Sequence, residues 1–464
     1  MKNKSKSISR VLIWQIISQI LLTGIATLTT PIFTRLLSQV EYGAFANYNS
    51  WVAIVGVVLS LQTAGSIVNA KAKYNVKNYM EYLSSIFVLS MVSFSVAIAF
   101  SFPFRKAFAV WFTMDEDIVP LVFIVSFFTY VISFYSKKLT VDLEIEKNAI
   151  IALINSIATF VLSLLFVKNM QYDKHIGRIY GILIPLVVIS IFEIADIWNH
   201  GKCVYKKEYW NYCLSLTLPL IFHSLAGMIL SLSDKVMLTN MKGEEATAIY
   251  TVAYSMGNII NMIWTAFNNT WIPFYYQYKN KKNYIEINQK LKNYIFIFTI
   301  ITVGFLLCVP EVFKIFAPNT YWTGLIIIPP IVMGYYFNFM YSIYGNFEFF
   351  HEKTKMISIG TVLCAVVNVI MNLILIPLKG ELGAAIATVA AYALLFMFHW
   401  GICKRVLKEE CEIENRYLIV GMIIVAMFSV GYYLTMSLSV IRWIFAVGLG
   451  VYTIRRIIIR RAII

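Results

Sequence analysis

Residues 148–167 read NAIIALINSIATFVLSLLFV, a run of twenty residues without a charged side chain. As an α-helix, such a run is about 30 Å long, which matches the hydrocarbon core of a lipid bilayer. Its apolar residues are continuous and do not alternate with polar ones, as they would in a strand of a membrane β-barrel. We therefore predict that this segment is a membrane-spanning helix.

Comparable apolar runs recur from one end of the chain to the other. Hydrophobic residues make up 59% of the chain and charged residues 14%, whereas soluble proteins have about 25% charged residues. The connections between the runs are too short for a soluble catalytic domain. The sequence thus predicts an all-α integral membrane protein with about fourteen transmembrane helices, at residues 11–34, 44–68, 82–104, 118–136, 148–167, 176–198, 212–238, 249–272, 292–316, 324–347, 356–378, 382–403, 417–436 and 440–458.

The net charge of +15 follows the predicted topology. An even number of spans places both termini on one side of the membrane, and roughly three times as many Lys and Arg residues lie on that side as on the other. This bias predicts that both termini and residues 273–292 are cytoplasmic. Attraction to membrane lipid headgroups follows from the same charges, and we expect no nucleic-acid partner.

The six cysteines have no spacing typical of metal ligands. The first apolar run is too long for the core of a cleavable signal peptide, and no small-residue cleavage site follows it. We expect free thiols, no metal site and no cofactor.

A weak internal repeat is visible. Residues 34–37 read TRLL and precede the run YGAFANY at residues 42–48, while residues 234–238 read DKVML and precede IYTVAY at residues 249–254. The two copies are six spans apart. This predicts two six-helix lobes, residues 1–203 and 204–410, related by a pseudo-two-fold axis along the membrane normal, with two extra C-terminal helices in residues 411–464. Transporters built in this way bind substrate between the lobes.

Two predicted spans have a polar stripe along one helix face. Such a stripe indicates either hydrogen bonding between helices or the lining of a wet cavity. Because the stripes run through most of the bilayer depth, cavity lining is favoured for both. They consist of Gln19, Thr23, Thr27, Thr30 and Thr34 in the first span, and Tyr250, Tyr254, Asn258, Asn261, Thr265 and Asn268 in the eighth.

Few ionisable residues fall within or at the edges of the spans. His223 lies in the middle of the seventh span, Asp234 lies on the same face, and Pro219 precedes His223 by one turn. A histidine at this depth either serves in coupling or makes a buried hydrogen bond. We expect Glu311 and Lys314 to pair. Four further residues near cytoplasmic helix ends are expected to snorkel or cap: Glu193, Asp196, Glu348 and His399.

Four motifs in this order resemble the Wzx-type polysaccharide flippases. They are Pro31…Arg35-Leu-Leu…Glu41-Tyr-Gly43; Ser233-Asp-Lys-Val-Met-Leu-Thr-Asn…Ile249-Tyr-Thr-Val-Ala-Tyr254; Phe349-Phe-His-Glu-Lys-Thr-Lys355; and Asn368-Val-Ile-Met-Asn-Leu-Ile-Leu-Ile-Pro377 followed by Glu381-Leu-Gly-Ala-Ala-Ile-Ala-Thr388.

The resemblance implies a bacterial inner-membrane protein with two six-helix lobes around a central cavity. By alternating access, it would move undecaprenyl-diphosphate-linked oligosaccharide repeat units from the inner to the outer leaflet, for O-antigen, capsule or exopolysaccharide synthesis. A polysaccharide polymerase and a chain-length regulator would be candidate partners. Cavities in this family tend to be cationic, and this sequence departs from that pattern because no Lys or Arg lies in the middle of a span.

Two other classes of function are weighed against a flippase. A multidrug cation antiporter of the same superfamily would carry an acidic residue deep in its first lobe, and the first five spans have none. An enzyme, such as a membrane glycosyltransferase or polysaccharide polymerase, would need catalytic groups on a sizeable external loop. The one acidic cluster, residues 115–117, is explained as a cap at the start of a span. We therefore expect a transporter and no catalytic residues.

For the substrate, an anionic lipid diphosphate calls for Arg or Lys. Arg35 and Lys235 occupy equivalent positions in the repeat, near the outer leaflet, and we predict that they face each other across the cavity mouth. Asn258 and Asn261 would contact sugar hydroxyls, and Gln19, Thr23, Thr27 and Tyr254 would line the path. His223 and Asp234 are the predicted coupling residues. The alternative is that both cations snorkel to headgroups, or that Lys235 pairs with Asp234.

Overall fold

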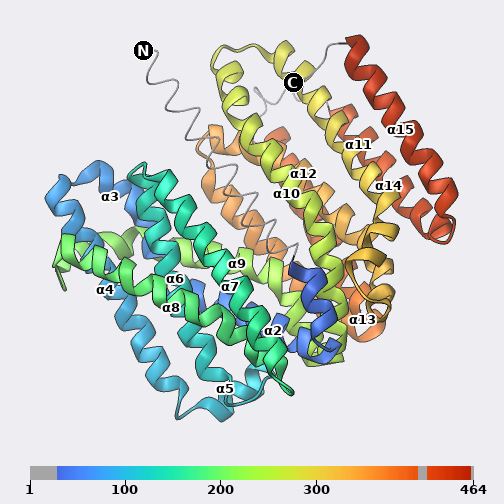
Figure 1. The fold of residues 1–464 in the computed structure, drawn as a ribbon. Coiled ribbons are helices and arrows are strands. Elements are labelled where there is room, and N and C mark those ends of the chain that lie inside the picture. Colours follow the sequence, from blue (N-terminus) through green and yellow to red (C-terminus); the bar gives the residue numbers. More distant parts are fainter. Residues whose placement is uncertain (1–28, 406–414, 461–464) are drawn as a thin grey trace. The chain divides into compact units, whose positions relative to one another are not determined.

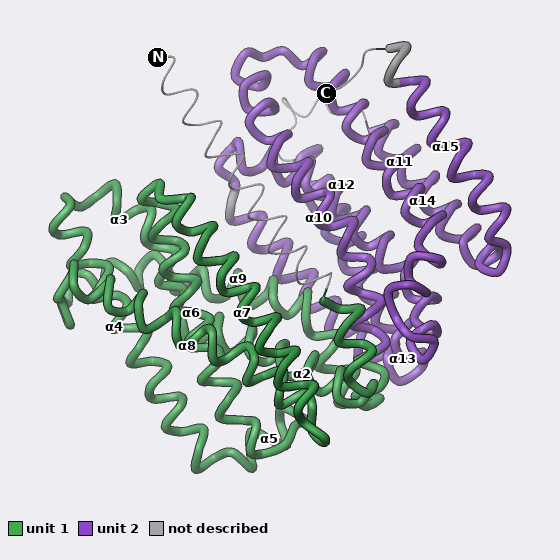
Figure 2. Tube along the Cα trace, viewed as in Figure 1, with its two compact units in different colours: residues 1–248 green, residues 249–464 purple. Residues whose placement is uncertain are grey.

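The computed structural model describes residues 29–405 and 415–460, and every regular element in these residues is a helix (Figure 1). They divide into two compact units after Ala248 (Figure 2). The chain is an all-helical, multi-pass integral membrane protein, as the sequence predicts. The lobes expected at residues 1–203, 204–410 and 411–464 stay a prediction.

Among the described residues, unit 1 holds nine helices and the first five residues of α10. Its helices are α2 (Gln39–Leu59), η1 (Thr63–Ser66), α3 (Ile67–Lys73), α4 (Val76–Ser101), α5 (Arg105–Phe112), α6 (Val119–Val141), α7 (Ile145–Asn169), α8 (Lys174–Gly201) and α9 (Lys207–Lys242).

Small residues allow the closest helix contacts in unit 1. Helix α7 packs along α8, and α2 packs against α6, α8 and α9. A Cβ atom at Gly181 of α8 would lie 2.3 Å from the backbone nitrogen of Ser163 in α7. Since such a contact is far inside van der Waals distance, only glycine fits at this crossing.

The Glu41-Tyr-Gly43 motif ties three helix ends together. Glu41 and Ser38 form a capping box at the start of α2, and Glu41 Oε1 also accepts a hydrogen bond from the backbone N–H of Lys174 at 2.8 Å. A Cβ atom at Gly43 would lie 1.8 Å from the carbonyl oxygen of Glu244, the first residue of α10. The motif therefore has a packing role, because it fixes the starts of α2, α8 and α10 against each other.

The predicted span at residues 44–68 contains a break that the sequence did not predict. Leu61 and Gln62 have left-handed backbone angles, with φ of 49° and 50°, and the segment that follows bends by 52°. Buried hydroxyl groups form hydrogen bonds with the backbone and with each other at this break. Ser90 Oγ donates to Ser60 O at 2.9 Å, and Thr63 Oγ1 lies 2.8 Å from both Ser90 Oγ and Tyr130 OH. A broken helix is tolerated at membrane depth when protein groups replace its lost hydrogen bonds.

Unit 2 contains the remaining elements and most of α10. Its helices are α10 (Glu244–Asn280), α11 (Tyr284–Phe316), η2 (Asn319–Ile327), α12 (Ile328–Phe350), α13 (Thr354–Arg405), α14 (Asn415–Thr435) and α15 (Ser439–Arg460).

Helix α13 contains two predicted spans, residues 356–378 and 382–403. Its 52 residues are two helical halves that meet at a kink, and they are enough for two crossings of the hydrocarbon core. Gly380 interrupts it with φ 56° and ψ −131°, which are not helical angles. The break falls where the sequence separates the two spans, at a residue that adopts such angles without steric cost.

Polar contacts attach the two C-terminal helices to α11 and η2. Tyr432 OH donates to Leu325 O at 3.0 Å, and Tyr433 OH donates to Ile326 O at 2.9 Å. In α15, the buried Arg442 guanidinium forms an ion pair with Glu311 of α11. The expected partner of Glu311, Lys314, instead lies over the Trp322 ring with its Nζ 5.4 Å from the centroid. That prediction is wrong because the sequence did not show that α15 packs on α11.

Nine helices of the described residues are long and apolar enough to cross a membrane, or ten if the bent pair formed by α2 and residues 63–73 is one span. Helix α13 is counted as one helix in this number, although it contains two predicted spans. Helices α10 and α15 are long enough to cross, but α10 carries many polar side chains and α15 carries four arginines.

Candidate functional site

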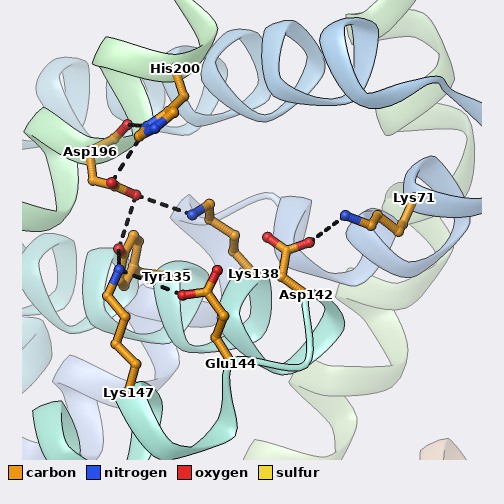
Figure 3. Close-up of polar contacts among 8 residues, drawn as sticks. All are labelled: Lys71, Tyr135, Lys138, Asp142, Glu144, Lys147, Asp196 and His200. Atoms are coloured by element: carbon orange, nitrogen blue, oxygen red, sulfur yellow. Dashed lines mark hydrogen bonds and ion pairs between the residues drawn. The ribbon is translucent and has the colours of Figure 1, made fainter.

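One end of unit 1 contains a network of charged side chains on four elements (Figure 3). Asp196 of α8 is its centre. Its Oδ2 accepts hydrogen bonds from Tyr135 OH at 2.9 Å and from Lys138 Nζ at 3.1 Å, both from α6, and its Oδ1 lies 3.5 Å from His200 Nδ1. Lys147 of α7 donates to the oxygen of Tyr135 at 2.9 Å. The prediction that Asp196 snorkels or caps is therefore corrected, because its carboxylate accepts two hydrogen bonds from the neighbouring helix α6.

The network extends to the connection between α6 and α7. Lys147 Nζ also lies 3.8 Å from Glu144 Oε2, and Lys71 of α3 forms an ion pair with Asp142 at 2.6 Å. Three lysines thus meet three carboxylates. Because the charges balance, this network is suited to holding α3, α6, α7 and α8 together and is poorly suited to capturing an anion.

The polar stripe of α10 lies against α12 in unit 2. Tyr335 OH donates to Asn258 Oδ1 at 3.2 Å, Trp264 Nε1 donates to Ser342 Oγ at 3.0 Å, and Asn346 Nδ2 donates to Asn268 Oδ1 at 2.8 Å. Hydrogen bonding between helices therefore accounts for part of the stripe. Its role in lining a cavity stays a prediction.

Two asparagines of this stripe keep free hydrogen-bonding groups. Asn261 Nδ2 donates to Asn258 Oδ1 at 3.0 Å, so Asn258 Oδ1 accepts from two donors. Within the described part of the chain, the Nδ2 group of Asn258 and Oδ1 of Asn261 have no protein partner, and both residues are half-buried. Tyr254 lies beside them, with its ring centroid 5.7 Å from that of Tyr335. An open donor beside an open acceptor, next to aromatic rings, is the kind of surface that binds sugar hydroxyls.

Arg35 and Lys235 both fall in unit 1. Arg35 is exposed, and its guanidinium donates to Pro31 O one turn earlier at 2.7 Å. Lys235 is half-buried, and its backbone carbonyl accepts from the Thr239 hydroxyl at 3.0 Å. Their predicted arrangement on opposite sides of a cavity mouth stays a prediction.

His223 and Asp234 lie on α9, which runs through Pro219 without ending. His223 is half-buried, and its Nδ1 is buried without a hydrogen-bond partner, while Asp234 is 1% exposed. Eleven residues of helix separate them by about 16 Å, so they do not form a direct hydrogen bond. Coupling between them would have to pass through water or substrate.

The remaining predicted residues, Gln19, Thr23 and Thr27, lie outside the described residues. Among those that are described, no group of three or more His, Cys, Asp or Glu side chains could hold a metal ion.

A buried pair was missed by the sequence analysis. Glu348 of α12 and His399 of α13 are both 0% exposed, and His399 Nδ1 lies 2.8 Å from Glu348 Oε1. The prediction that these residues snorkel or cap is wrong, because neither side chain reaches solvent. Each is an ionisable residue in a largely apolar segment, and this is the feature of the sequence that could have indicated a buried pair. The pairing itself could not be predicted, because the two residues are 51 positions apart along the chain.

The helices and their polar contacts define a multi-pass membrane protein whose fold is that of known transporters. The solved structure of the lipid II flippase MurJ in an inward closed conformation matches with a TM-score of 0.70, covering 95% of this chain and 99% of the other at 15% identity. An inward-facing multidrug resistance MATE family transporter of the MOP superfamily matches with a TM-score of 0.59 at 16% identity, covering 85% of this chain and 96% of the transporter.

Residues 9–279, more than half of the chain, match the family model described as polysaccharide biosynthesis protein. The chain therefore belongs to this family.

Relatives by sequence are distant. An uncharacterized membrane protein of Methanocaldococcus jannaschii is 21% identical, over 92% of this chain and 89% of the relative. The Lsg locus putative protein 1 of Haemophilus influenzae is 20% identical, over 74% of this chain and 84% of the relative.

Proposed function

We propose that this protein is a flippase that moves undecaprenyl-diphosphate-linked oligosaccharide repeat units across a bacterial cytoplasmic membrane by alternating access. The repeat units would serve O-antigen, capsule or exopolysaccharide synthesis. A polysaccharide polymerase and a chain-length regulator would act on the transported units.

The observation that carries this proposal is a fold shared with a lipid II flippase over 95% of the chain, in a member of a polysaccharide biosynthesis family. The match to the multidrug transporter is weaker, with a TM-score of 0.59 against 0.70. A lipid-linked sugar therefore suits the fold better than a small cation.

In this proposal Arg35 and Lys235 attract the diphosphate, and Asn258, Asn261 and Tyr254 contact the sugars, with Gln19, Thr23 and Thr27 along the path. The free Nδ2 of Asn258 and Oδ1 of Asn261 support the sugar-binding role. No step requires a catalytic group, a metal or a cofactor, so we propose transport without enzyme activity.

We also propose fourteen spans, with two six-helix lobes, two added C-terminal helices and both termini in the cytoplasm. Single cysteines placed at Lys281 and Arg460 test this topology in a variant without the native cysteines. Both positions should be inaccessible to a membrane-impermeant thiol reagent in intact cells and should react after permeabilisation. Labelling of either one from outside would exclude the fourteen-span arrangement.

The function is tested with purified protein in liposomes that contain an undecaprenyl-diphosphate-linked oligosaccharide. A glycosidase added outside removes sugar only from lipids in the outer leaflet. With protein present, the protected inner half should become accessible, whereas protein-free liposomes should keep about half of the sugar protected, because such lipids are distributed over both leaflets and cross slowly.

A second function, export of organic cations, is favoured by one observation. Glu193 of α8 is 3% exposed and its Oε2 has no hydrogen-bond partner, so a buried carboxylate is present in unit 1. Efflux of a fluorescent organic cation from the same liposomes tests this alternative. Cation efflux that depends on Glu193, without any change in glycosidase protection, would replace the flippase proposal.

A further inference from the structure

The contact between α12 and α13 in unit 2 encloses an acid and a base away from solvent. Glu348 is in the last turn of α12, and His399 is six residues before the end of α13. Both are 0% exposed, and the distance from His399 Nδ1 to Glu348 Oε1 is 2.8 Å. A Cβ atom at Gly360 would lie 2.5 Å from His399 Nε2, so the first half of α13 closes over the imidazole.

Half of the hydrogen-bonding capacity of this pair is unused. Glu348 Oε2 and His399 Nε2 are buried, and neither has a partner among the described residues. Buried polar atoms without partners are rare in native proteins because each one costs free energy. Oε2 and Nε2 are therefore open positions at which this pair can bind a proton.

The groups around the pair do not neutralise a carboxylate. On α12, the Tyr341 ring lies 4.7 Å from the imidazole between centroids. On α13, the Cys403 thiol lies 3.8 Å from Glu348 Oε1, and on α14, Asn415 contacts Tyr344. Within the described chain, Glu348 forms no ion pair with any Lys or Arg.

One buried cation lies near the end of α12: Lys279 of α10 is 5% exposed, and its Nζ lies 4.9 Å from the Phe347 ring centroid and 4.7 Å from that of Tyr284. The nearest cations along the chain point to solvent. Lys353 and Lys355 after α12, and Lys404 and Arg405 at the end of α13, are all exposed. Exposed charges are screened by water and stabilise a buried carboxylate only weakly.

Charge balance then decides the protonation state. An ionised Glu348 beside a neutral His399 would leave one net negative charge buried, which is strongly unfavourable without a partner cation. One added proton makes the pair neutral, whether it resides on the imidazole or on the carboxylate. The proton comes from water, and no covalent bond other than N–H or O–H changes.

We propose that Glu348 and His399 form a proton-binding site. The pair holds one proton while α12 and α13 are packed together, and it releases the proton to water when these helices separate. The site is near the short connection at residues 351–353, so water would reach it when the helix ends separate. The proposal does not depend on which substrate the protein transports.

The proton is detected in the purified full chain in lipid bilayers at about neutral pH. Solid-state NMR of protein labelled with ¹⁵N-histidine distinguishes imidazolium from neutral imidazole, and the infrared carboxylic acid band reports a protonated Glu348. One of the two signals should be present. Either signal should disappear in Glu348→Gln. In His399→Gln an imidazolium signal should disappear, whereas a carboxylic acid band should persist because Glu348 stays buried without a cation partner. Neutral imidazole at His399 together with an ionised Glu348 would refute the site.

Glu352→Gln is the matched control, because Glu352 is an exposed carboxylate four residues after Glu348. It should leave both signals unchanged. If a single substitution prevents folding, the double variant Glu348→Gln/His399→Gln is used, in which two amides can keep a hydrogen bond. Retention of the same signals in the folded double variant would likewise refute the assignment.

Release of the proton is tested through Cys403. The thiol is 0% exposed, so iodoacetamide should modify it only when α12 and α13 separate. In the wild type, raising the pH removes the proton. The resulting increase in the rate of Cys403 modification should be about tenfold larger in the wild type than in the double variant. Removing the negative carboxylate would by itself make the Cys403 thiol more reactive in the double variant. This effect therefore cannot explain a larger increase in the wild type. An equal increase in both proteins would refute the linkage to helix separation.

Discussion

Asp196 and Glu348 each pair with a histidine, and the two carboxylates differ in what else surrounds them. Asp196 in unit 1 has a side chain that is 27% exposed and contacts Lys138, Tyr135 and His200. Glu348 in unit 2 is 0% exposed and contacts His399, with the nearby Cys403 thiol. The first carboxylate is neutralised by a lysine, whereas the second has no Lys or Arg partner among the described residues and is neutral in our proposal when the pair holds a proton.

The difference separates two uses of ionisable groups in a membrane protein. A carboxylate with a lysine partner and several hydrogen bonds holds helices together, and its removal should affect stability. A group with unused hydrogen-bonding atoms can exchange a ligand or a proton, and its removal should affect function. Four sets of substitutions test or refine this division, from the largest expected effect to the smallest.

Lys138→Met should produce the largest effect. The Lys138 side chain is 7% exposed, so the substitution leaves Asp196 without its lysine in a mostly buried place. We expect a loss of about 3 kcal/mol in the free energy of unfolding, measured by thermal or denaturant unfolding in detergent.

Lys71→Met is the matched control within the same network. The Lys71 side chain is 41% exposed in its ion pair with Asp142, so its loss should cost less than about 1 kcal/mol. Equal losses for the two lysines would show that the network around Asp196 is not what stabilises this end of unit 1.

Arg35→Ala and Lys235→Ala extend the comparison to cations of unit 1 outside that network. If they bind the diphosphate, each should lower flipping about thirtyfold, because charge-assisted hydrogen bonds contribute about 2 kcal/mol. The double variant should have no measurable activity. Glycosidase protection, normalised to the amount of protein in the liposomes, is the measurement, and wild-type flipping by the double variant would exclude the predicted role.

The double variant Asn258→Ala/Asn261→Ala tests the free amide groups of unit 2. It should lower flipping about tenfold and leave the unfolding temperature nearly unchanged, since two hydrogen bonds to sugar hydroxyls are lost. Asn268→Ala is the control, because Asn268 bonds to Asn346 of α12 and should affect stability more than transport. The opposite pattern would make Asn258 and Asn261 packing residues.

His223→Ala should have the smallest effect, a decrease of about fivefold, at the lower end of typical coupling energies. The buried, unpartnered Nδ1 of His223 suits a proton carrier. The dependence of flipping on a pH gradient is the measurement, and it should weaken in the variant. An unaltered pH dependence at full activity would leave His223 as a residue that only packs.

Much of the fold follows from local features of the sequence. The apolar runs predict the helices, and the break between residues 378 and 382 coincides with the non-helical Gly380. The bend after Leu59 was not predicted, because it depends on Ser90 and Tyr130, which are 30 and 67 positions away from their partners.

The candidate site could be predicted only in part. The stripe with Asn258 and Asn261 was found from helical spacing, but its contact with Tyr335 and Ser342 of α12 could not be, because spacing does not show which helix is the neighbour. The same reason explains why Glu311 was paired with Lys314 and not with Arg442 of α15.

The sequence by itself determined that this protein is helical and crosses a membrane many times, because hydrophobic length and charge bias act locally along the chain. Only the tertiary structure decided which charged groups meet, which are buried and which keep unused hydrogen-bonding atoms. Glu348 and Asp196 looked alike in the sequence, as acids near helix ends. Their different environments arise because burial and partners depend on helices that pack together from distant parts of the chain.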